Sequence, residues 1–277
     1  IIKILRKYTE IYLQKHNPKI VAITGSNGKT STREAIYAVL KSKYSVRRSE
    51  KNYNTEIGVP LSVLGIDSPK RFWGWPVVLF RAYWIAQKSK HAPEILILEM
   101  AADKPGDLKY LTSFVKPDIS VVTAIGDLPV HVEAFSGPKA VAEEKSHIVK
   151  VLEANGVAIL NYDDKIVLDM KNKTKGHVFT FGFEKGSTIR ALEEKSVFCI
   201  PEDDDDFCGV SFKVESDNRV VPVRLRNVYG KPPAYAALAA FAVGKAIGMN
   251  LIEIAEALKG YKSPKGRMHL IEGMRES

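Results

Sequence analysis

The stretch KIVAITGSNGKTSTREAIYAVL, residues 19–40, contains three consecutive signals. The apolar run IVAIT is typical of a buried strand, and KTSTREAIYAVLKS has the apolar spacing of an amphipathic helix. Between them, TGSNGKTS supplies glycines that let backbone N–H groups approach phosphates, at the positive end of the following helix. The segment therefore predicts a strand, a phosphate-binding loop and a helix, with an ordinary glycine-rich turn as the alternative.

The spacing within this loop indicates what each residue does. We expect Lys29 to reach the terminal phosphates of a nucleotide and the Thr30 hydroxyl to ligate Mg²⁺. The usual G-x-x-x-x-G-K-[ST] pattern would place its first glycine where Ile23 stands, so the loop is a shortened form. The expected ATP-binding residues of the loop are Gly25, Ser26, Asn27, Gly28, Lys29, Thr30 and Ser31.

Composition limits the classes of protein that this chain can be. Its 277 residues are 45% hydrophobic and 26% charged, which is the make-up of a soluble globular protein with one large or two small domains. The formal charge of +9 favours anionic ligands, but without a long basic run or an aromatic-interleaved basic motif we expect no nucleic acid partner. No signal peptide and no membrane-spanning run is present, so a cytoplasmic location is expected.

Two cysteines, Cys199 and Cys208, flank the acidic tract PEDDDD at the turn of a predicted hairpin. We expect free thiols, as is usual in a reducing compartment, with a disulfide bridge as the alternative.

Strand-length apolar runs alternate with amphipathic stretches along most of the chain. Strands are expected at 94–100, 118–125 and 156–161, and a helix at 137–153. This alternation predicts an α/β fold with a mostly parallel sheet flanked by helices. After residue 176 the runs HVFTFGF, TIRALEE, VSFKVES and VVPVRLR predict a small antiparallel β annex, followed by helices at 232–248 and 250–261.

The segment RFWGWPVVLFRAYWIAQKSK, residues 71–90, places six aromatic residues among arginines and lysines. Such a segment is a candidate for contact with a membrane surface. We favour a helix whose aromatic face packs on the domain.

Several further motifs occur in a fixed order along the chain. TGSNGKT resembles the ATP loop of the Mur ligase superfamily, which characteristically lacks the first Walker glycine. The other segments that resemble this superfamily are KNYNTEIGVP (51–60), ILILEMAADKPGDLKYL (95–111), TAIGDLPVHVEAFSG (123–137), VAEEKSHI (141–148), AILNYDD (158–164) and GRM (266–268). The resemblance implies the P-loop-containing central domain of a Mur ligase.

The same resemblance implies an activity. Members of the superfamily join a carboxylate to an amine by way of an acyl phosphate made with ATP. The wording NTEIGVP and the ending GRM are most similar to the MurF type, which adds D-alanyl-D-alanine to a UDP-muramoyl tripeptide in peptidoglycan precursor synthesis. Alternatives are a folylpolyglutamate- or cyanophycin-type ligase, and a non-catalytic nucleotide-binding or membrane-associated scaffold. The expected partners are small molecules, a nucleotide-linked acyl acceptor and an amino acid or dipeptide, bound by a monomer.

Matching motifs also assign roles to individual residues. By resemblance, Glu99 ligates one Mg²⁺, His131 holds a second, and Lys145 reacts with CO₂ to form a carbamate that ligates the second metal. A carbamate needs a neutral amine and hence a lowered pKa at Lys145; without the family, Lys145 is a charge on the solvated face of its helix. The remaining expected contacts are Asn52, Asn54 and Thr55 with the acyl substrate, and Asn161, Asp163 and Asp164 with adenine and ribose.

The sequence departs from the family at four positions. Pro232 and Ala236 replace a histidine and an asparagine at the start of the helix after Gly230, and Ala124 and His147 also differ from the usual residues. The expected domains are an N-terminal helix at 1–18, the central ATP-binding domain at 19–265, and at 266–277 a linker to a missing C-terminal domain.

Overall fold

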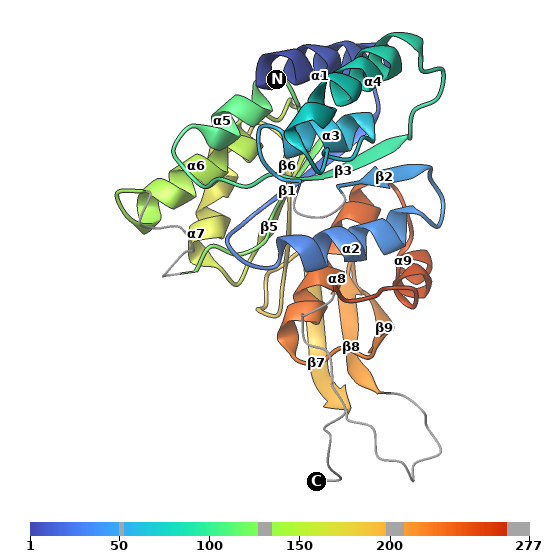
Figure 1. Ribbon diagram of the computed structural model, residues 1–277. Helices are drawn as coiled ribbons and strands as arrows, with labels where there is room; N and C mark the ends of the chain where they lie inside the picture. Colours follow the sequence, from blue (N-terminus) through green and yellow to red (C-terminus); the bar gives the residue numbers. More distant parts are fainter. Residues whose placement is uncertain (50–52, 127–134, 198–207, 265–277) are drawn as a thin grey trace, which may run out of the picture.

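A single hydrogen-bonded sheet runs through the protein (Figure 1). The computed structural model describes residues 1–49, 53–126, 135–197 and 208–264. Within these residues the sheet has nine strands in the order β2-β3-β1-β4-β5-β6-β7-β8-β9. The strands are β1 (Lys19–Thr24), β2 (Val46–Arg48), β3 (Ile95–Glu99), β4 (Ile119–Val122), β5 (Val157–Asn161), β6 (His177–Gly182), β7 (Ile189–Val197), β8 (Gly209–Ser216) and β9 (Arg219–Arg226).

The central strand β1 carries the phosphate loop at its carboxyl end. It lies between β3 and β4 and pairs with both in parallel, with Ile23 opposite Glu99 and Thr24 opposite Val122. These strands are buried on both faces, which explains their continuous apolar runs. Because parallel strands end at the same edge, the residues that follow β3 and β4 flank the loop on its two sides.

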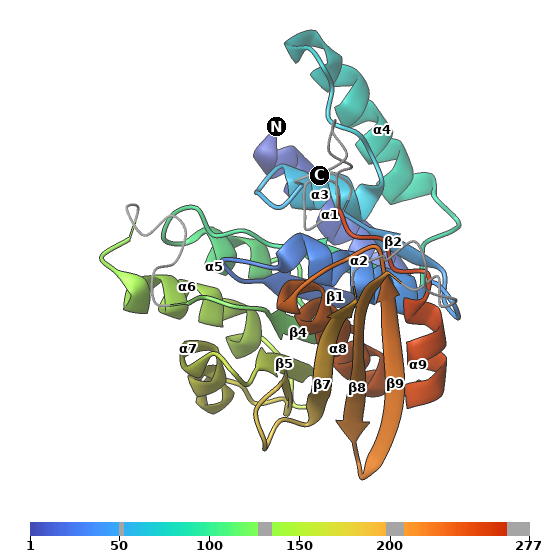
Figure 2. The ribbon, with the colours of Figure 1, turned by 90° about the horizontal axis from the view of Figure 1, so that it is seen from below.

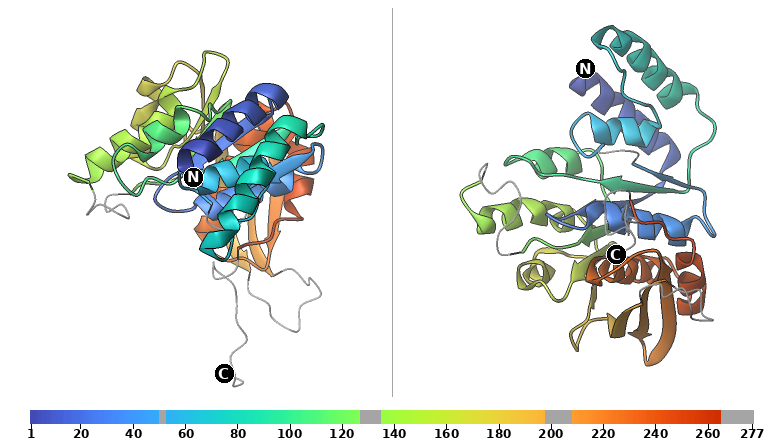
Figure 3. Two further views of the ribbon diagram at one scale, coloured as in Figure 1. Left: turned by 45° about the horizontal axis from the view of Figure 1, so that its top comes forward. Right: turned by 60° about the horizontal axis from the view of Figure 1, so that its bottom comes forward.

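Helices cover both faces of the sheet, as the sequence predicts (Figures 1 and 3). One hydrophobic core joins the sheet to α2, α8 and α9, and the other joins it to α1, α3, α5 and α6. The helices are α1 (Ile2–His16), α2 (Lys29–Leu40), α3 (Gly58–Leu64), α4 (Trp75–Lys88), α5 (Asp107–Thr112), α6 (Pro138–Lys150), α7 (Lys165–Leu168), α8 (Lys231–Ala246) and α9 (Leu251–Leu258), with 3₁₀ turns η1 (Phe72–Gly74) and η3 (Asp169–Lys173).

The antiparallel part of the sheet is smaller than predicted. The run HVFTFGF forms β6, which pairs in parallel with β5 because α7 and η3 carry the chain back across the sheet. Among the described strands, antiparallel pairing is confined to β7 with β8 and β8 with β9, and β7 joins this group to β6 through a short parallel pairing. The predicted annex is therefore a continuation of the main sheet, packed against α8 and α9 (Figure 2).

Two other predictions from the sequence differ from the structure, one of them only in part. Cys208 is disulfide-bonded, so it is not a free thiol; Cys199 lies outside the described residues. Of the aromatic side chains of α4, Trp75 packs against the core and the Tyr83 ring contacts Tyr8 of α1, but Phe80 and Trp84 are exposed. The fully buried residues of this helix are Val78, Ala82 and Ala86, so its aromatic side does not form the main packing face. No helix among the described residues is long and apolar enough to span a bilayer.

Candidate active site

The phosphate loop is fixed by close contact with the chain that follows β4. Gly25 has φ +146°, and a Cβ at this position would lie 2.0 Å from Thr123 Oγ1. The N–H of Ser26 donates to the carbonyl of Ala124 at 2.6 Å, and the Thr123 hydroxyl donates to the Asn27 carbonyl at 2.5 Å. Glycine is therefore required at position 25 for both conformation and space.

The loop leads directly into α2, whose N-cap residue, Gly28, has φ +84°. The first turn of a helix directs N–H groups outward without intrahelical partners, which makes it a binding place for anions. Thr30 and the half-buried Ser31 belong to this turn. The expected loop residues are thus together at one end of α2.

Two lysines converge on the loop. Lys29 Nζ donates to the Gly25 carbonyl at 2.7 Å and to that of Ser26 at 3.2 Å. Lys145 Nζ, from α6, donates to the same Gly25 oxygen at 3.3 Å. Both ammonium groups therefore lie where the terminal phosphates of a nucleotide in this loop would be.

Lys145 is buried, with 4% of its surface exposed, so the solvated-face interpretation is wrong. Burial and, after it, the neighbouring charge of Lys29 lower the pKa of its ammonium group to about 8, against the opposing effect of Asp103 and Glu144. A substantial fraction of Lys145 is thus neutral at slightly alkaline pH, which is the form that can act as a nucleophile.

Glu144, next to Lys145, fixes α6 against the start of α5. Its buried carboxylate accepts from the N–H of Gly106 at 2.9 Å and from that of Leu108 at 2.8 Å. These bonds satisfy N–H groups at the N-terminus of α5 that would otherwise lack partners. Because the next side chain along α6 is Lys145, this cap also sets the position of the lysine relative to the loop.

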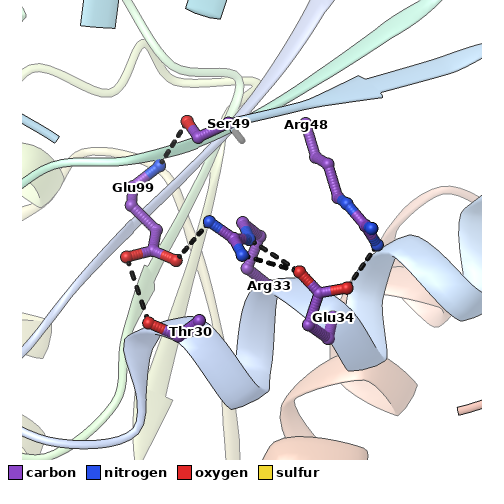
Figure 4. A network of polar contacts seen from close by, with 6 residues as sticks. All are labelled: Thr30, Arg33, Glu34, Arg48, Ser49 and Glu99. Atoms are coloured by element: carbon purple, nitrogen blue, oxygen red, sulfur yellow. Dashed lines mark hydrogen bonds and ion pairs between the residues drawn. The ribbon is translucent and has the colours of Figure 1, made fainter. Parts of the chain in front are cut away.

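Glu99, the last residue of β3, reaches toward the first turn of α2 (Figure 4). Its Oε2 is 3.5 Å from the Thr30 hydroxyl, and its Oε1 forms a 3.0 Å ion pair with Arg33 that lacks the alignment of a hydrogen bond. Burial raises the pKa of this carboxyl, and the positive charge of Arg33 opposes that shift.

Arg33 and its partners were not predicted from the sequence. Arg33 is buried and donates from Nε and Nη2 to Glu34 Oε1, at 2.9 and 2.7 Å. Glu34 also pairs with Arg48 of β2, so a chain of alternating charges leads from the sheet edge to Glu99 (Figure 4). The signal in the sequence was the position of Arg33, four residues after Lys29 on the same face of α2.

Thr30 and Glu99 provide oxygen atoms suited to a hard divalent cation. A carboxylate and a hydroxyl 3.5 Å apart, beside a phosphate loop, fit Mg²⁺ as two of its ligands with phosphate oxygens and water as the others. The poorly satisfied Oε1 of Glu99 is a further acceptor for the ion. His131 lies outside the described residues, within which no cluster of three or more His, Cys, Asp or Glu side chains forms a metal site.

A cavity of about 620 Å³ opens beside the loop. It is bounded by the loop, by the carboxyl ends of β4 and β5, and by the first turn of α8. Its lining residues are Asn27, Gly28, Thr32, Thr123, Ala124, Gly126, Asn161, Asp163, Asp164, Lys165, Ile166, Phe181, Pro232, Tyr235 and Ala236. The three residues expected to contact adenine and ribose are all among them, as are both substituted positions of α8.

The two aspartates of this cavity bond mainly to the protein itself. Asp164 caps α7 with Oδ1 and accepts from the N–H groups of Ile125 and Gly126 with Oδ2. Asp163 accepts from two backbone N–H groups after β6, at Phe183 and Glu184, and from the Tyr235 hydroxyl at 2.7 Å. The aspartates therefore tie the cavity walls together.

Asn161 differs from the two aspartates. Its side-chain oxygen Oδ1 accepts from the Asp163 N–H, and its side-chain amide borders the cavity. On the other side of the loop, the Asn54 carbonyl accepts from the N–H of Ala101, just after β3. The Thr55 hydroxyl accepts from the Gly58 N–H at 3.4 Å, at the start of α3. Asn54 and Thr55 thus lie at the same edge of the sheet as the loop, and Asn52 lies outside the described residues.

A parallel sheet with a glycine loop and lysine at the end of its central strand, and a cavity beside it, defines a nucleotide-binding α/β domain. The family model described as Mur ligase middle domain matches residues 23–71 and 82–244. The chain belongs to the Mur ligase family.

Relatives and solved structures agree with this assignment. The chain is 27% identical, over 271 residues, to the UDP-N-acetylmuramoyl-tripeptide–D-alanyl-D-alanine ligase of Bacillus subtilis, covering 97% of this chain and 50% of that protein. It superimposes on the MurF ligase of Thermotoga maritima in complex with ADP with a TM-score of 0.75 at 25% identity, covering 99% of this chain and 55% of the other. Superposition on MurF from Acinetobacter baumannii gives a TM-score of 0.77 at 23% identity, covering 98% of this chain and 52% of the other. The chain spans about half the length of the curated relatives that it matches.

Proposed function

We propose that the protein is an ATP-dependent ligase that adds D-alanyl-D-alanine to a UDP-muramoyl tripeptide. The proposal is carried by one observation: Lys29, Lys145 and the Thr30–Glu99 pair surround a single phosphate loop. The names of the relatives support the choice of substrates. With this function we also expect a cytoplasmic location and a monomeric state.

In the proposed reaction the γ-phosphoryl group passes to the substrate carboxylate, and ADP leaves. The amine then attacks the acyl phosphate, which forms the amide and releases inorganic phosphate. Phosphoryl transfer depends mostly on positioning and charge neutralisation. Lys29 supplies a positive charge to the terminal phosphates, and Thr30 and Glu99 would hold Mg²⁺, which neutralises phosphate charge when bound.

Lys145 has a separate proposed role. Its neutral amine attacks CO₂, forming an N–C bond and, after loss of one proton to solvent, an anionic carbamate. The lowered pKa supports this step because it provides the neutral amine. The charge at this position changes from positive to negative, which would provide oxygen ligands for a second Mg²⁺ together with His131.

The cavity beside the loop is the proposed place of the adenosine part of ATP. The Asn161 amide would recognise the base, while Asp163 and Asp164 hold the walls in place. Pro232 and Ala236 offer no side-chain hydrogen-bond donor on the α8 side of the cavity, and the hydroxyl of Tyr235 there already donates to Asp163, so we propose that the base is held on this side by packing. On the opposite side of the loop, Asn52, Asn54 and Thr55 are the proposed contacts to the acyl substrate.

The test is phosphate release by the native gene product with ATP, Mg²⁺, UDP-muramoyl tripeptide and D-alanyl-D-alanine. We expect release that requires both organic substrates, and a ligated product of the summed mass less water. Phosphate release with a folate or with a different acid and amine, but not with UDP-muramoyl tripeptide and D-alanyl-D-alanine, would indicate another type of ligase in the family. ATP binding without any coupled release would indicate the non-catalytic scaffold.

A further inference from the structure

The outer surface of α4 and η1 carries a group of exposed large apolar side chains. We call it the aromatic face; it consists of Phe72, Trp73, Val77, Phe80, Tyr83 and Trp84. Phe72 is 80% exposed, Trp73 72% and Phe80 65%. Contiguous exposed apolar surface of this kind marks a site of interaction with another surface.

Helical spacing accounts for this exposure. Val78, Ala82 and Ala86 recur every four residues and form the buried side of α4, which packs on α1 and α3. Val77, Phe80 and Trp84 recur at intervals of three and four on the opposite side. The views in Figures 2 and 3 place α4 as the outermost helix on its side of the molecule, beyond α1 and α3.

This segment is a departure from the family to which the chain belongs. The family model matches residues 23–71 and then 82–244, so residues 72–81 lie outside it. They include four of the six residues of the aromatic face. The nucleotide-binding elements of the domain therefore do not explain why these side chains are present.

The surroundings of the aromatic face are positively charged. Residues 68–93 contain no Asp or Glu, while Lys70, Arg71, Arg81, Lys88 and Lys90 are all exposed. The adjacent α1 carries Lys3, Lys7 and Lys15, and Lys15 donates to the Gln87 carbonyl of α4. Its Arg6 is paired with Glu10, the single acid of this helix. A partner that fits this surface has an apolar layer for the aromatic side chains and anionic groups for the surrounding lysines and arginines.

We propose that the aromatic face is a docking surface for an anionic lipid bilayer. Tryptophan and phenylalanine side chains enter the interfacial layer, and arginine and lysine side chains remain at the level of the lipid phosphates. The helix has 14 residues and carries Arg81 and Lys88, so it lies in the plane of the interface and does not cross the bilayer. The binding is peripheral and falls with ionic strength.

The tryptophans of this chain provide a direct readout. All three, Trp73, Trp75 and Trp84, lie in this segment, so selectively excited tryptophan fluorescence reports on it alone. The probe is vesicles of phosphatidylglycerol and phosphatidylcholine in equal parts, compared with vesicles of phosphatidylcholine. We expect a blue-shifted emission with the anionic vesicles, quenching by brominated acyl chains, and reversal by high salt.

Vesicle flotation of the native gene product tests the residues. Phe72→Ser together with Phe80→Ser keeps all three tryptophans, and we expect about a tenfold lower partition coefficient, because binding scales with buried apolar area. The matched control is Val220→Ser with Ile252→Ser, since these residues are 51% and 68% exposed on β9 and α9, away from the aromatic face. The control should float like the wild type, and both variants should keep wild-type nucleotide affinity.

Three results would overturn the proposal. The first is a wild-type protein that does not float with anionic vesicles. The second is equal flotation of the Phe72→Ser/Phe80→Ser variant and the control. The third is a dimer in solution, measured by sedimentation, that this variant dissociates while vesicles have no effect, which would assign the aromatic face to a second copy of the chain. None of these results bears on ligase activity, so the proposed function is tested separately.

Discussion

Lys29 and Lys145, from different helices, donate hydrogen bonds to one acceptor, the carbonyl oxygen of Gly25. Two like charges around one oxygen repel each other, and the deeper of the two, Lys145, has the lowered pKa. The arrangement is therefore electrostatically unfavourable without an anion. Binding of a phosphate, or conversion of Lys145 to an anionic group, would relieve it.

The lowered pKa of Lys145 predicts a pH-dependent contribution to stability. Between the folded value of about 8 and the unfolded value near 10.5, the unfolded chain binds more protons, so stability rises with pH across this window. Relative to Lys145→Met, the wild type should gain at most about 3 kcal/mol in free energy of unfolding from pH 8 to pH 10.5. Urea unfolding in CO₂-free buffer without metal measures this difference.

Lys29→Met is the control for that experiment. Removing the neighbouring positive charge should raise the pKa of Lys145 and so narrow the pH range over which stability rises. An identical pH dependence in wild type and Lys145→Met would show that Lys145 titrates at its ordinary value and is not held by the loop.

Substitution of Lys145 should also test its proposed carbamate. We expect Lys145→Ala to lose ligase activity by more than about a hundredfold, because the proposed metal ligand is removed. A short carboxylic acid such as acetate should restore part of the activity by occupying the space of the carbamate. Lys145→Arg, which keeps the positive charge, should be inactive with and without acetate. Full activity of Lys145→Ala would remove the carbamate from the mechanism.

Arg33 should be essential for stability because it neutralises a buried carboxylate. Arg33→Met leaves Glu99 without its ion-pair partner, and we expect a loss of about 3–5 kcal/mol in free energy of unfolding near neutral pH. This loss should be smaller at low pH. The pKa of Glu99 is raised in the folded state, so at low pH its carboxyl is protonated in both the folded and the unfolded chain. It destabilises the folded state only as the pH rises and the carboxyl ionises. Urea unfolding at pH 4 and pH 7.5 measures both effects.

A second substitution separates this explanation from a general packing defect. Glu99→Gln added to Arg33→Met removes the uncompensated charge and should recover most of the loss. If the double variant is as unstable as Arg33→Met, the cost comes from packing of the arginine side chain.

Much of this architecture could be predicted from the sequence because it depends on local patterns. The apolar runs of β1, β3, β4 and β5 and the glycines of the loop are contiguous signals, and they place Gly25, Lys29 and Glu99 at one edge of a sheet. The short edge strand β2 and the parallel pairing of β6 were missed. Three residues at an edge carry no clear alternation, and pairing direction depends on the connection between strands.

Contacts between distant segments were beyond prediction. AEEKSHIVK carries charges all around α6, so nothing local indicates that Glu144 and Lys145 are buried against the α5 N-terminus and the loop. Likewise, the partners of Asp164 are N–H groups at residues 125 and 126, far away in the sequence. On α4 the large aromatic residues are the stronger signal for burial, but the smaller Val78, Ala82 and Ala86 form the packing face.

The Tyr235–Asp163 hydrogen bond should stabilise the cavity wall. Burial and the nearby carboxylate raise the pKa of Tyr235, so the hydroxyl stays protonated and donates at 2.7 Å. Tyr235→Phe should cost about 2 kcal/mol in free energy of unfolding, because the acceptor is charged. Tyr83→Phe, at an exposed ring of α4, is the control and should change stability by less than about 0.5 kcal/mol. Equal effects of the two substitutions would contradict the assignment.

The close fit of Gly25 against Thr123 predicts different effects for two glycines of the same loop. Both Gly25 and Gly28 have positive φ, but an added Cβ meets Thr123 Oγ1 at 2.0 Å only at position 25; at position 28 the nearest atom is 3.7 Å away. Gly25→Ala should therefore abolish nucleotide binding, measured by calorimetry with ADP, whereas Gly28→Ala should weaken it by about tenfold through backbone strain alone. Thr123→Ala in the Gly25→Ala background removes the clashing oxygen and should restore part of the affinity. If both glycine variants bind ADP equally, the contact with Thr123 does not determine the shape of the loop.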